Sequence, residues 1–253
     1  MTVSIANLSS SLYDAALALV YPLGCAVCGG SVESNRDGVA CAQCWEATRI
    51  FSGAETVCWK CGAFSRAHVT PEKRRNIRCG QCDTDMFTAA RACGFYEGAL
   101  RESIVALKRE PDVAPRLVRL MLTTQQREPI DTADLIVPVP LHPDRERERG
   151  FNQAVLLARE LARESNLPID EFCLARQIHT ERHRGGMDAR ARRASVDGAF
   201  SVRHADSIVG RRVLLVDDVF TSGATVSACA AVLIDAGAEE VFVLTVARPQ
   251  AYE

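Results

Sequence analysis

Two adjacent acids followed by a turn of small and hydroxyl-bearing residues form the part of this sequence best suited to chemistry. They belong to the string Val-Leu-Leu-Val-Asp-Asp-Val-Phe-Thr-Ser-Gly-Ala-Thr at residues 213–225. Its four branched apolar residues in a row predict a strand that is buried on both faces. Asp217 and Asp218 then fall at the carboxyl end of that strand, where open α/β sheets bind their ligands.

The turn after the two acids is suited to binding a phosphate group. It leads into an apolar pattern from Val226 to Ala236 that predicts a helix. Backbone N–H groups at a helix N-terminus, together with nearby hydroxyls, can surround an anion, and a glycine lets the backbone approach it closely. The residues that we expect to do this are Thr221, Ser222, Gly223, Ala224 and Thr225.

Two other protein classes also place acids after an apolar strand. Phospho-acceptor receiver domains carry such acids near the start of the domain, whereas Asp217 and Asp218 lie far along this chain. P-loop NTPases need a G-x-x-x-x-G-K-[ST] string, which this sequence lacks. The string instead resembles the signature of the type I phosphoribosyltransferases. The resemblance implies that the two acids hydrogen-bond the ribose hydroxyls of phosphoribosyl pyrophosphate, that the turn holds its 5′-phosphate, and that Mg²⁺ accompanies the ligand.

Cysteine spacing predicts two metal sites ahead of this domain. Eight of the eleven cysteines form four Cys-x-x-Cys pairs, a spacing typical of zinc ligands and unlike scattered disulfide cysteines. We expect two closed, structural zinc sites and a reducing, cytoplasmic location. Pairing the first knuckle with the second and the third with the fourth is the default, and an interleaved pairing is the alternative. The expected ligands are Cys25, Cys28, Cys41, Cys44, Cys58, Cys61, Cys79 and Cys82.

The remaining elements must position these residues. After the fourth knuckle the pattern changes to alternating strands and helices, which predicts a parallel sheet flanked by helices. We expect a zinc module at residues 1–88, with a short amphipathic helix from Leu8 to Val20, and an α/β domain at residues 89–253. The expected strands are 89–96, 135–139, 213–216 and 241–246, and the expected helices include 98–108, 115–126 and 150–164.

A second phosphate-binding element is expected after another strand. Three arginines, Arg145, Arg147 and Arg149, follow the apolar run that ends at Val139, and a helix is expected to begin at Gly150. Guanidinium groups beside a helix N-terminus suit bidentate contacts with pyrophosphate. Taken alone, the alternating charges of this segment fit an exposed loop equally well.

These segments, taken in order, resemble the ComF/GntX family across nearly the whole chain. The shared strings are the four knuckles, Tyr-Glu-Gly at 96–98, Leu-Lys at 107–108, Val-Pro-Val-Pro-Leu at 137–141, Arg-Gly-Phe-Asn-Gln at 149–153 and Gly-Ala-Phe at 198–200. The resemblance implies an N-terminal double zinc ribbon joined to a type I phosphoribosyltransferase domain, and a link to natural competence and DNA uptake. This chain departs from the family pattern at residues 184–188, Ser195 and residues 109–111.

Three functions remain open at this point. One is an enzyme that transfers the phosphoribosyl group of phosphoribosyl pyrophosphate to an acceptor. Another is a module that binds single-stranded DNA or a nucleotide without chemistry, through basic segments at 66–78 and 182–193. The third is a docking protein for a competence helicase. The apolar stretch Leu12–Leu23 is too short to span a bilayer, and no basic residue precedes Arg36, so we expect neither a signal peptide nor membrane insertion.

Overall fold

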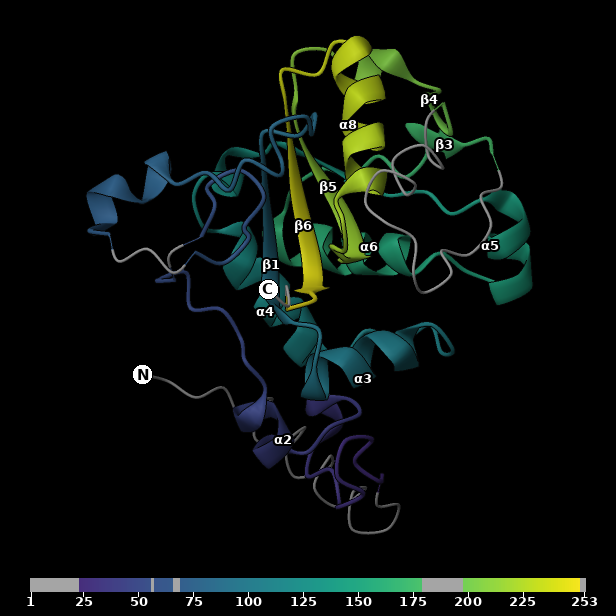
Figure 1. Cartoon of the computed structure of the whole chain (residues 1–253). Helices are drawn as coiled ribbons and strands as arrows, with labels where there is room; N and C mark the ends of the chain where they lie inside the picture. The colour runs from purple at the N-terminus through teal and green to yellow at the C-terminus, as the bar shows by residue number, and fades with distance from the viewer. Residues whose placement is uncertain (1–22, 56, 66–68, 179–197, 251–253) are drawn as a thin grey trace.

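Four parallel strands form the sheet on which the described chain is built (Figure 1). A computed structural model describes residues 23–55, 57–65, 69–178 and 198–250. The strands lie in the order β1-β6-β5-β2. Long runs of branched and apolar residues favour this arrangement, because a parallel sheet is buried on both faces. The bounds are β1 Ala89–Phe95, β2 Leu135–Pro138, β5 Arg212–Val219 and β6 Glu240–Arg248.

Helices cover both faces of the sheet (Figure 1). Successive side chains of a strand point to opposite faces, so Leu214 and Val216 of β5 join one core and Val213 and Leu215 join the other. The first core is completed by α3 Gly98–Leu107, α4 Pro115–Gln125 and α6 Gln153–Ser165. The second is completed by α8 Ala224–Asp235 and by a small antiparallel pair, β3 Leu174–Arg176 and β4 Phe200–Val202.

Short elements connect this framework and hold the cysteine-rich half. The connections contain α5 Pro143–Arg149 and the 3-10 turns η3 Ile130–Thr132 and η4 Ala205–Ser207. The cysteine-rich half contains η1 Asn35–Asp37, α2 Ala42–Ala47 and η2 Pro71–Asn76. None of the helices in the described ranges is long and apolar enough to cross a membrane.

The cysteine-rich half consists of two ribbons that contact different parts of the sheet domain. The first ribbon carries the knuckles at 25–28 and 41–44, and the second ribbon carries the knuckles at 58–61 and 79–82. The first ribbon packs on α3 and α4: Trp45 is buried there, Arg116 of α4 lies over its ring, and the Thr48 hydroxyl accepts a hydrogen bond from the Ala99 N–H. The second ribbon covers the edge strand β1, where the Ala90 N–H donates to the Lys60 carbonyl at 2.6 Å. A covered edge strand is protected from pairing with another chain.

Most of the expected elements are confirmed within a few residues, and the expected start of one helix was wrong. The helix expected from Gly150, α6, begins at Gln153, and the three arginines Arg145, Arg147 and Arg149 lie in a separate helix, α5, where the alternative was an exposed loop. Local capping explains both differences. The His142 side chain accepts from the Asp144 N–H at the start of α5, and Gly150, at φ 85°, ends it. The Asn152 side chain then caps α6 by accepting from the Ala154 N–H.

The structure also shows an earlier helix start and two strands that were not expected, and some expectations lie on residues that it does not describe. The helix expected to follow the turn begins at Ala224, so Ala224 and Thr225 belong to its first turn. Neither β3 nor β4 was expected. The expected helix from Leu8 to Val20, the basic segment at 182–193 and the departures at 184–188 and Ser195 lie outside the described residues.

Gly94 of β1 lies in close contact with the segment that joins the two ribbons and with α3. A Cβ atom there would lie 2.5 Å from the Arg49 carbonyl oxygen and 2.6 Å from Leu100 Cδ1. We expect Gly94→Ala to destabilise the protein by about 2–4 kcal/mol, because overpacking forces the backbone to move. Urea denaturation measures the change, with Gly24→Ala as control because its Cβ would meet no atom within 4 Å. Equal stability of the two variants would contradict the expectation.

Candidate functional site

The eight knuckle cysteines form two four-thiol clusters. Within each cluster, all four sulfur atoms lie within 4.8 Å of one another. The clusters confirm the default pairing of the knuckles and exclude the interleaved one. They consist of Cys25, Cys28, Cys41 and Cys44, and of Cys58, Cys61, Cys79 and Cys82.

The spacing of the sulfur atoms fits zinc. Tetrahedral zinc with ligands at about 2.3 Å requires thiolates about 3.8 Å apart. Cys28 Sγ and Cys41 Sγ are 3.8 Å apart in the first cluster, and Cys58 Sγ and Cys82 Sγ are 3.6 Å apart in the second. Four thiolates complete the tetrahedron, so these are structural zinc sites with no coordination position left for a reactive water.

The two acids lie at the carboxyl end of β5 and point to opposite faces of the sheet. Asp218 continues the series of Leu214 and Val216, and Asp217 continues the series of Val213 and Leu215. The acids remain connected through the backbone, because the Asp218 N–H donates to Asp217 Oδ1 at 2.8 Å. The helices α3 and α6 lie on the Asp218 side, and α8 lies on the Asp217 side.

Asp218 is buried and held by two side chains from distant parts of the chain. Lys108, at the C-terminal end of α3, places its Nζ 2.9 Å from Asp218 Oδ2. Gln153, the first residue of α6, donates from Nε2 to the same oxygen at 3.3 Å. These contacts fix the orientation of the Asp218 carboxylate.

Asp217 has a different electrostatic environment. Burial at the end of the strand, reinforced by the negative charge of Asp218, raises the pKa of Asp217 to about 8. The Asp218 N–H, Lys108 and Arg176 act in the opposite direction. Arg176 comes from β3 and stacks on Phe200 of β4 at 5.3 Å. Burial, together with the charge of Arg145, lowers the pKa of Arg176. Arg145 and Arg176 therefore bring positive charge to the Asp217 side of the sheet.

The raised pKa of Asp217 predicts a pH-dependent stability. A carboxyl whose folded pKa of about 8 exceeds the ordinary 3.8 stabilises the fold at low pH, and this contribution is lost as the pH rises towards 8. Asp217→Asn removes the penalty, so its melting temperature relative to the parent should rise by several degrees between pH 5 and pH 8. Scanning calorimetry across this range measures the difference. Asp131→Asn, at an exposed position, serves as control, and a flat difference for Asp217→Asn would refute the assignment.

The turn after the acids ends at Gly223, the residue before α8. Gly223 adopts φ 77° immediately before α8 begins, so the amide groups of the first helical turn are presented at the carboxyl edge of the sheet. A Cβ on Gly223 would lie 2.9 Å from the Phe220 ring, which also disfavours any larger residue. Thr221 is exposed, Ser222 and Thr225 are partly exposed, and Gly223 and Ala224 are buried.

The three arginines of α5 lie at the same edge but differ in their contacts. This edge is shared because β2, which leads into α5, pairs in parallel with β5. Arg147 is exposed and forms an ion pair with Asp144, whereas Arg149 donates to the Gln153 side chain. Arg145 is the arginine whose charge reaches Arg176.

Three residues near the acids were not among the expected site residues: Lys108, Gln153 and Arg176. Two of them carried a sequence signal, because Leu-Lys at 107–108 and Arg-Gly-Phe-Asn-Gln at 149–153 belong to the strings that carried the family resemblance. Arg176 had no such signal, since β3 is three residues long and carries no periodic pattern.

Comparisons with known proteins find similarity in the cysteine-rich segment and along most of the chain. The double zinc ribbon domain family matches residues 16–83. Competence protein F of Haemophilus influenzae is 29% identical over 233 residues, which are 88% of this chain and 96% of that protein. DNA utilization protein YhgH of Escherichia coli is 29% identical over 238 residues, which are 91% of this chain and 99% of that protein. A glutamine phosphoribosylpyrophosphate amidotransferase from B. subtilis is 23% identical with a TM-score of 0.35, and the match covers 51% of this chain and 25% of that one.

The fold and the metal sites define a class: a double zinc ribbon joined to a parallel α/β sheet that is flanked by helices and carries two acids at the carboxyl end of β5. Within that class, the chain is similar to competence protein F and to the YhgH proteins over most of its length. This confirms the resemblance drawn from the knuckles and the later strings.

Proposed function

We propose that the chain binds phosphoribosyl pyrophosphate, or a related nucleotide, together with Mg²⁺ at the carboxyl edge of the sheet. The observation that carries this proposal is the placement of two acids, which point to opposite faces of the sheet, at the end of β5 and a short turn before the helix that follows Gly223. Asp217 and Asp218 would contact the ribose hydroxyls. The residues from Thr221 to Thr225 would hold the 5′-phosphate through backbone N–H groups and hydroxyls.

The pyrophosphate group needs cations on the neighbouring strand. Arg145 of α5 and Arg176 of β3 are the best placed of the described residues, because the charge of Arg145 helps to lower the pKa of Arg176 and the charge of Arg176 acts to lower the pKa of Asp217. Guanidinium groups bind phosphate oxygens in pairs of parallel hydrogen bonds. Arg147 and Arg149 have the weaker claim, because Asp144 and Gln153 already engage them.

Magnesium fits the chemistry of this edge. Mg²⁺ prefers oxygen ligands, keeps several waters and is usually shared between substrate phosphates and one or two carboxylates. The edge offers the carboxylates of Asp217 and Asp218, with no thiol or imidazole required. When bound, the ion would neutralise charge on the pyrophosphate as it leaves.

Transfer of the phosphoribosyl group is the reaction that such a site would support. An acceptor forms a bond to the anomeric carbon of the ribose while the bond from that carbon to a pyrophosphate oxygen breaks, and pyrophosphate departs with the bonding electrons. Positioned hydrogen bonds and cations would stabilise the charge that develops on the two parts. Calorimetric titration of phosphoribosyl pyrophosphate with Mg²⁺ into the zinc-loaded protein tests the binding step, and an absence of heat would refute the proposal.

A second candidate function comes from the relatives. Their names describe a competence protein and a DNA utilization protein, and we infer that this chain also acts in the uptake or use of DNA. The second ribbon supports this inference, because Lys73, Arg74 and Arg75 lie in η2 and Arg78 follows it. Single-stranded DNA is the partner that we propose for this surface, and a competence helicase is the protein partner that the ribbons would serve.

A further inference from the structure

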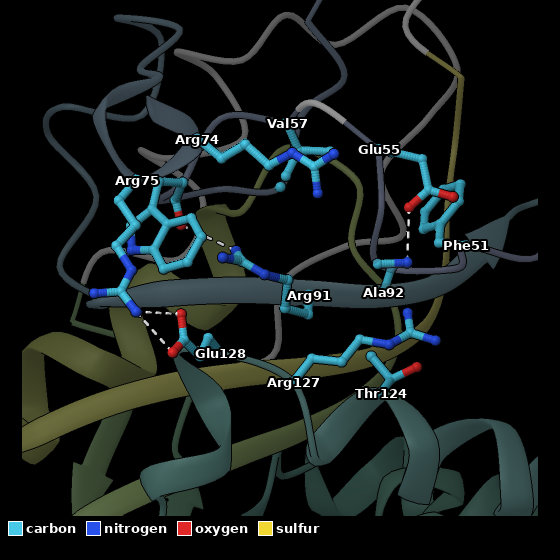
Figure 2. Close-up of a pocket in the computed structure, with 13 residues that line it drawn as sticks. Phe51, Glu55, Val57, Arg74, Arg75, Arg91, Ala92, Thr124, Arg127 and Glu128 are labelled. Atoms are coloured by element: carbon cyan, nitrogen blue, oxygen red, sulfur yellow. Dashed lines mark hydrogen bonds and ion pairs between the residues drawn. The ribbon is translucent and has the colours of Figure 1, made fainter. Parts of the chain in front are cut away.

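A pocket of about 230 Å³ lies where the second ribbon, β1 and the end of α4 meet (Figure 2). This pocket is separate from the acids at the end of β5. It lies against β1, an outer strand of the sheet, and β6 lies between β1 and β5. Four arginines contribute to its lining: Arg74 and Arg75 from η2, Arg91 from β1, and Arg127, which follows α4.

Positive charge exceeds negative charge in this pocket. Its two acids are Glu55 and Glu128. Glu128 pairs with Arg75 at 2.6 Å, and Glu55 accepts hydrogen bonds from the N–H groups of Ser52 and Gly53 in its own turn. Among the residues that the structure describes, no carboxylate pairs with Arg74, Arg91 or Arg127.

Two of these guanidinium groups have buried nitrogen atoms without a hydrogen-bond partner in the described parts of the chain. They are Nε of Arg74 and Nη2 of Arg91. An unsatisfied buried donor of a charged group costs free energy, so a protein rarely keeps two around one cavity without a ligand that accepts from them. Figure 2 shows Arg74 on one side of the opening and Arg127 on the other, with Arg91 between them on the strand.

Part of the role of Arg91 is structural. Its Nη1 donates to the Trp59 and Ala90 carbonyls, and the thiolates of Cys58 and Cys61 lie near enough to raise its pKa. Burial nevertheless outweighs them and lowers the pKa of Arg91 to about 10. Within the described parts of the chain, no side-chain hydrogen bond joins Arg74 or Arg127 to the ribbon, although Arg127 packs against Gly53, so these two residues give the cleaner test.

We propose that this pocket binds a phosphate group through Arg74, Arg91 and Arg127. Phosphate oxygens accept the paired hydrogen bonds that guanidinium groups donate. The volume is below the roughly 300–1,000 Å³ of pockets that enclose a drug-sized ligand. A single phosphate with its sugar therefore fits better than a whole dinucleotide, and Phe51 and Trp59 supply apolar walls beside it.

The phosphate has two possible sources, a free nucleotide or one phosphodiester of a single strand that continues outside the pocket. The free-nucleotide form is independent of both functions proposed above, whereas the single-strand form rests on the proposed DNA role. Each source contributes the same anion, so the variants that test the pocket are the same and the probes distinguish the sources.

The test compares Arg74→Gln/Arg127→Gln with the parent protein. The matched control is Arg119→Gln/Arg211→Gln, because both of these arginines are exposed and lie outside the pocket. The probes are a fluorescein-labelled oligothymidylate, followed by anisotropy at several salt concentrations, and thymidine 5′-phosphate, followed by calorimetry. Zinc content and circular dichroism establish that each variant is folded.

We expect the pocket variant to lose about 10-fold or more in affinity and the control to lose little. Loss with both probes identifies a nucleotide phosphate, and loss with the oligothymidylate alone identifies a strand phosphodiester, with a salt slope reduced by about 1–2. Equal affinities of variant and control, or no binding of either probe by the parent, would overturn the proposal. The pocket variant should still bind phosphoribosyl pyrophosphate, whereas Asp217→Asn/Asp218→Asn should still bind at the pocket.

Discussion

Replacement of both acids, Asp217→Asn and Asp218→Asn, should reduce the affinity for phosphoribosyl pyrophosphate by about 100-fold or more. Hydrogen bonds to charged groups contribute roughly 1.5–3 kcal/mol each, and above pH 8, where the Asp217 carboxyl is ionised as well, two such contacts would be weakened together. Asparagine keeps the size of the side chain, so the end of β5 should retain its shape. Calorimetric titration with Mg²⁺ into the zinc-loaded proteins measures the difference.

The control for this experiment replaces two exposed acids, Asp131→Asn and Asp235→Asn, which changes the net charge equally. Its affinity should remain within about twofold of the parent, because screened surface charges contribute little. If the Asp217 and Asp218 variant binds as tightly as this control, the ribose is not held at β5. If no protein binds the ligand, the DNA and partner functions become the leading candidates.

Loss of the second zinc site should have the largest effect on folding. Cys58→Ser/Cys61→Ser should leave one zinc ion per chain and abolish the cooperative thermal transition. Structural zinc contributes on the order of 10 kcal/mol, which is comparable with the whole stability of a typical domain, about 5–15 kcal/mol. Metal analysis measures the number of zinc ions per chain, and scanning calorimetry measures the thermal transition.

The physical reason lies in how the second ribbon is attached. Its backbone accepts hydrogen bonds from the Ala90 N–H of β1, from the side chain of Arg91 and from the side chain of Arg248 of β6. Gly62 lies so close to this strand that a Cβ atom would be 2.8 Å from the Ala90 carbonyl oxygen. When the knuckles separate, β1 loses this cover and becomes an open edge.

Two isolated cysteines provide the matched control. Cys173 and Cys229 are buried outside the clusters, so Cys173→Ala/Cys229→Ala should keep two zinc ions and a cooperative transition at a moderately lower temperature. A normal transition in the Cys58 and Cys61 variant would show that this site does not hold the ribbon on the sheet.

Local patterns were enough to predict much of this protein. The Cys-x-x-Cys spacing predicted both metal clusters, because neighbouring thiolates across a tight turn reach one ion whatever the rest of the chain does. The apolar runs predicted the four strands of the parallel sheet, because strands that are buried on both faces are apolar along their whole length. The arginine helix α5 was missed because its start and end depend on capping by His142 and Gly150 rather than on an apolar period.

Only the tertiary structure decided what surrounds each predicted residue. Lys108 and Arg176 approach the acids from α3 and β3, on opposite faces of the sheet, and no short-range spacing in the sequence encodes that approach. The arginine pocket likewise brings Arg74, Arg91 and Arg127 together from three separate elements. The sequence by itself therefore determined the local elements, the metal ligands and the acid-and-turn motif. Packing decided the charges and partners around them, because contacts between distant segments form only when the sheet and the ribbons assemble.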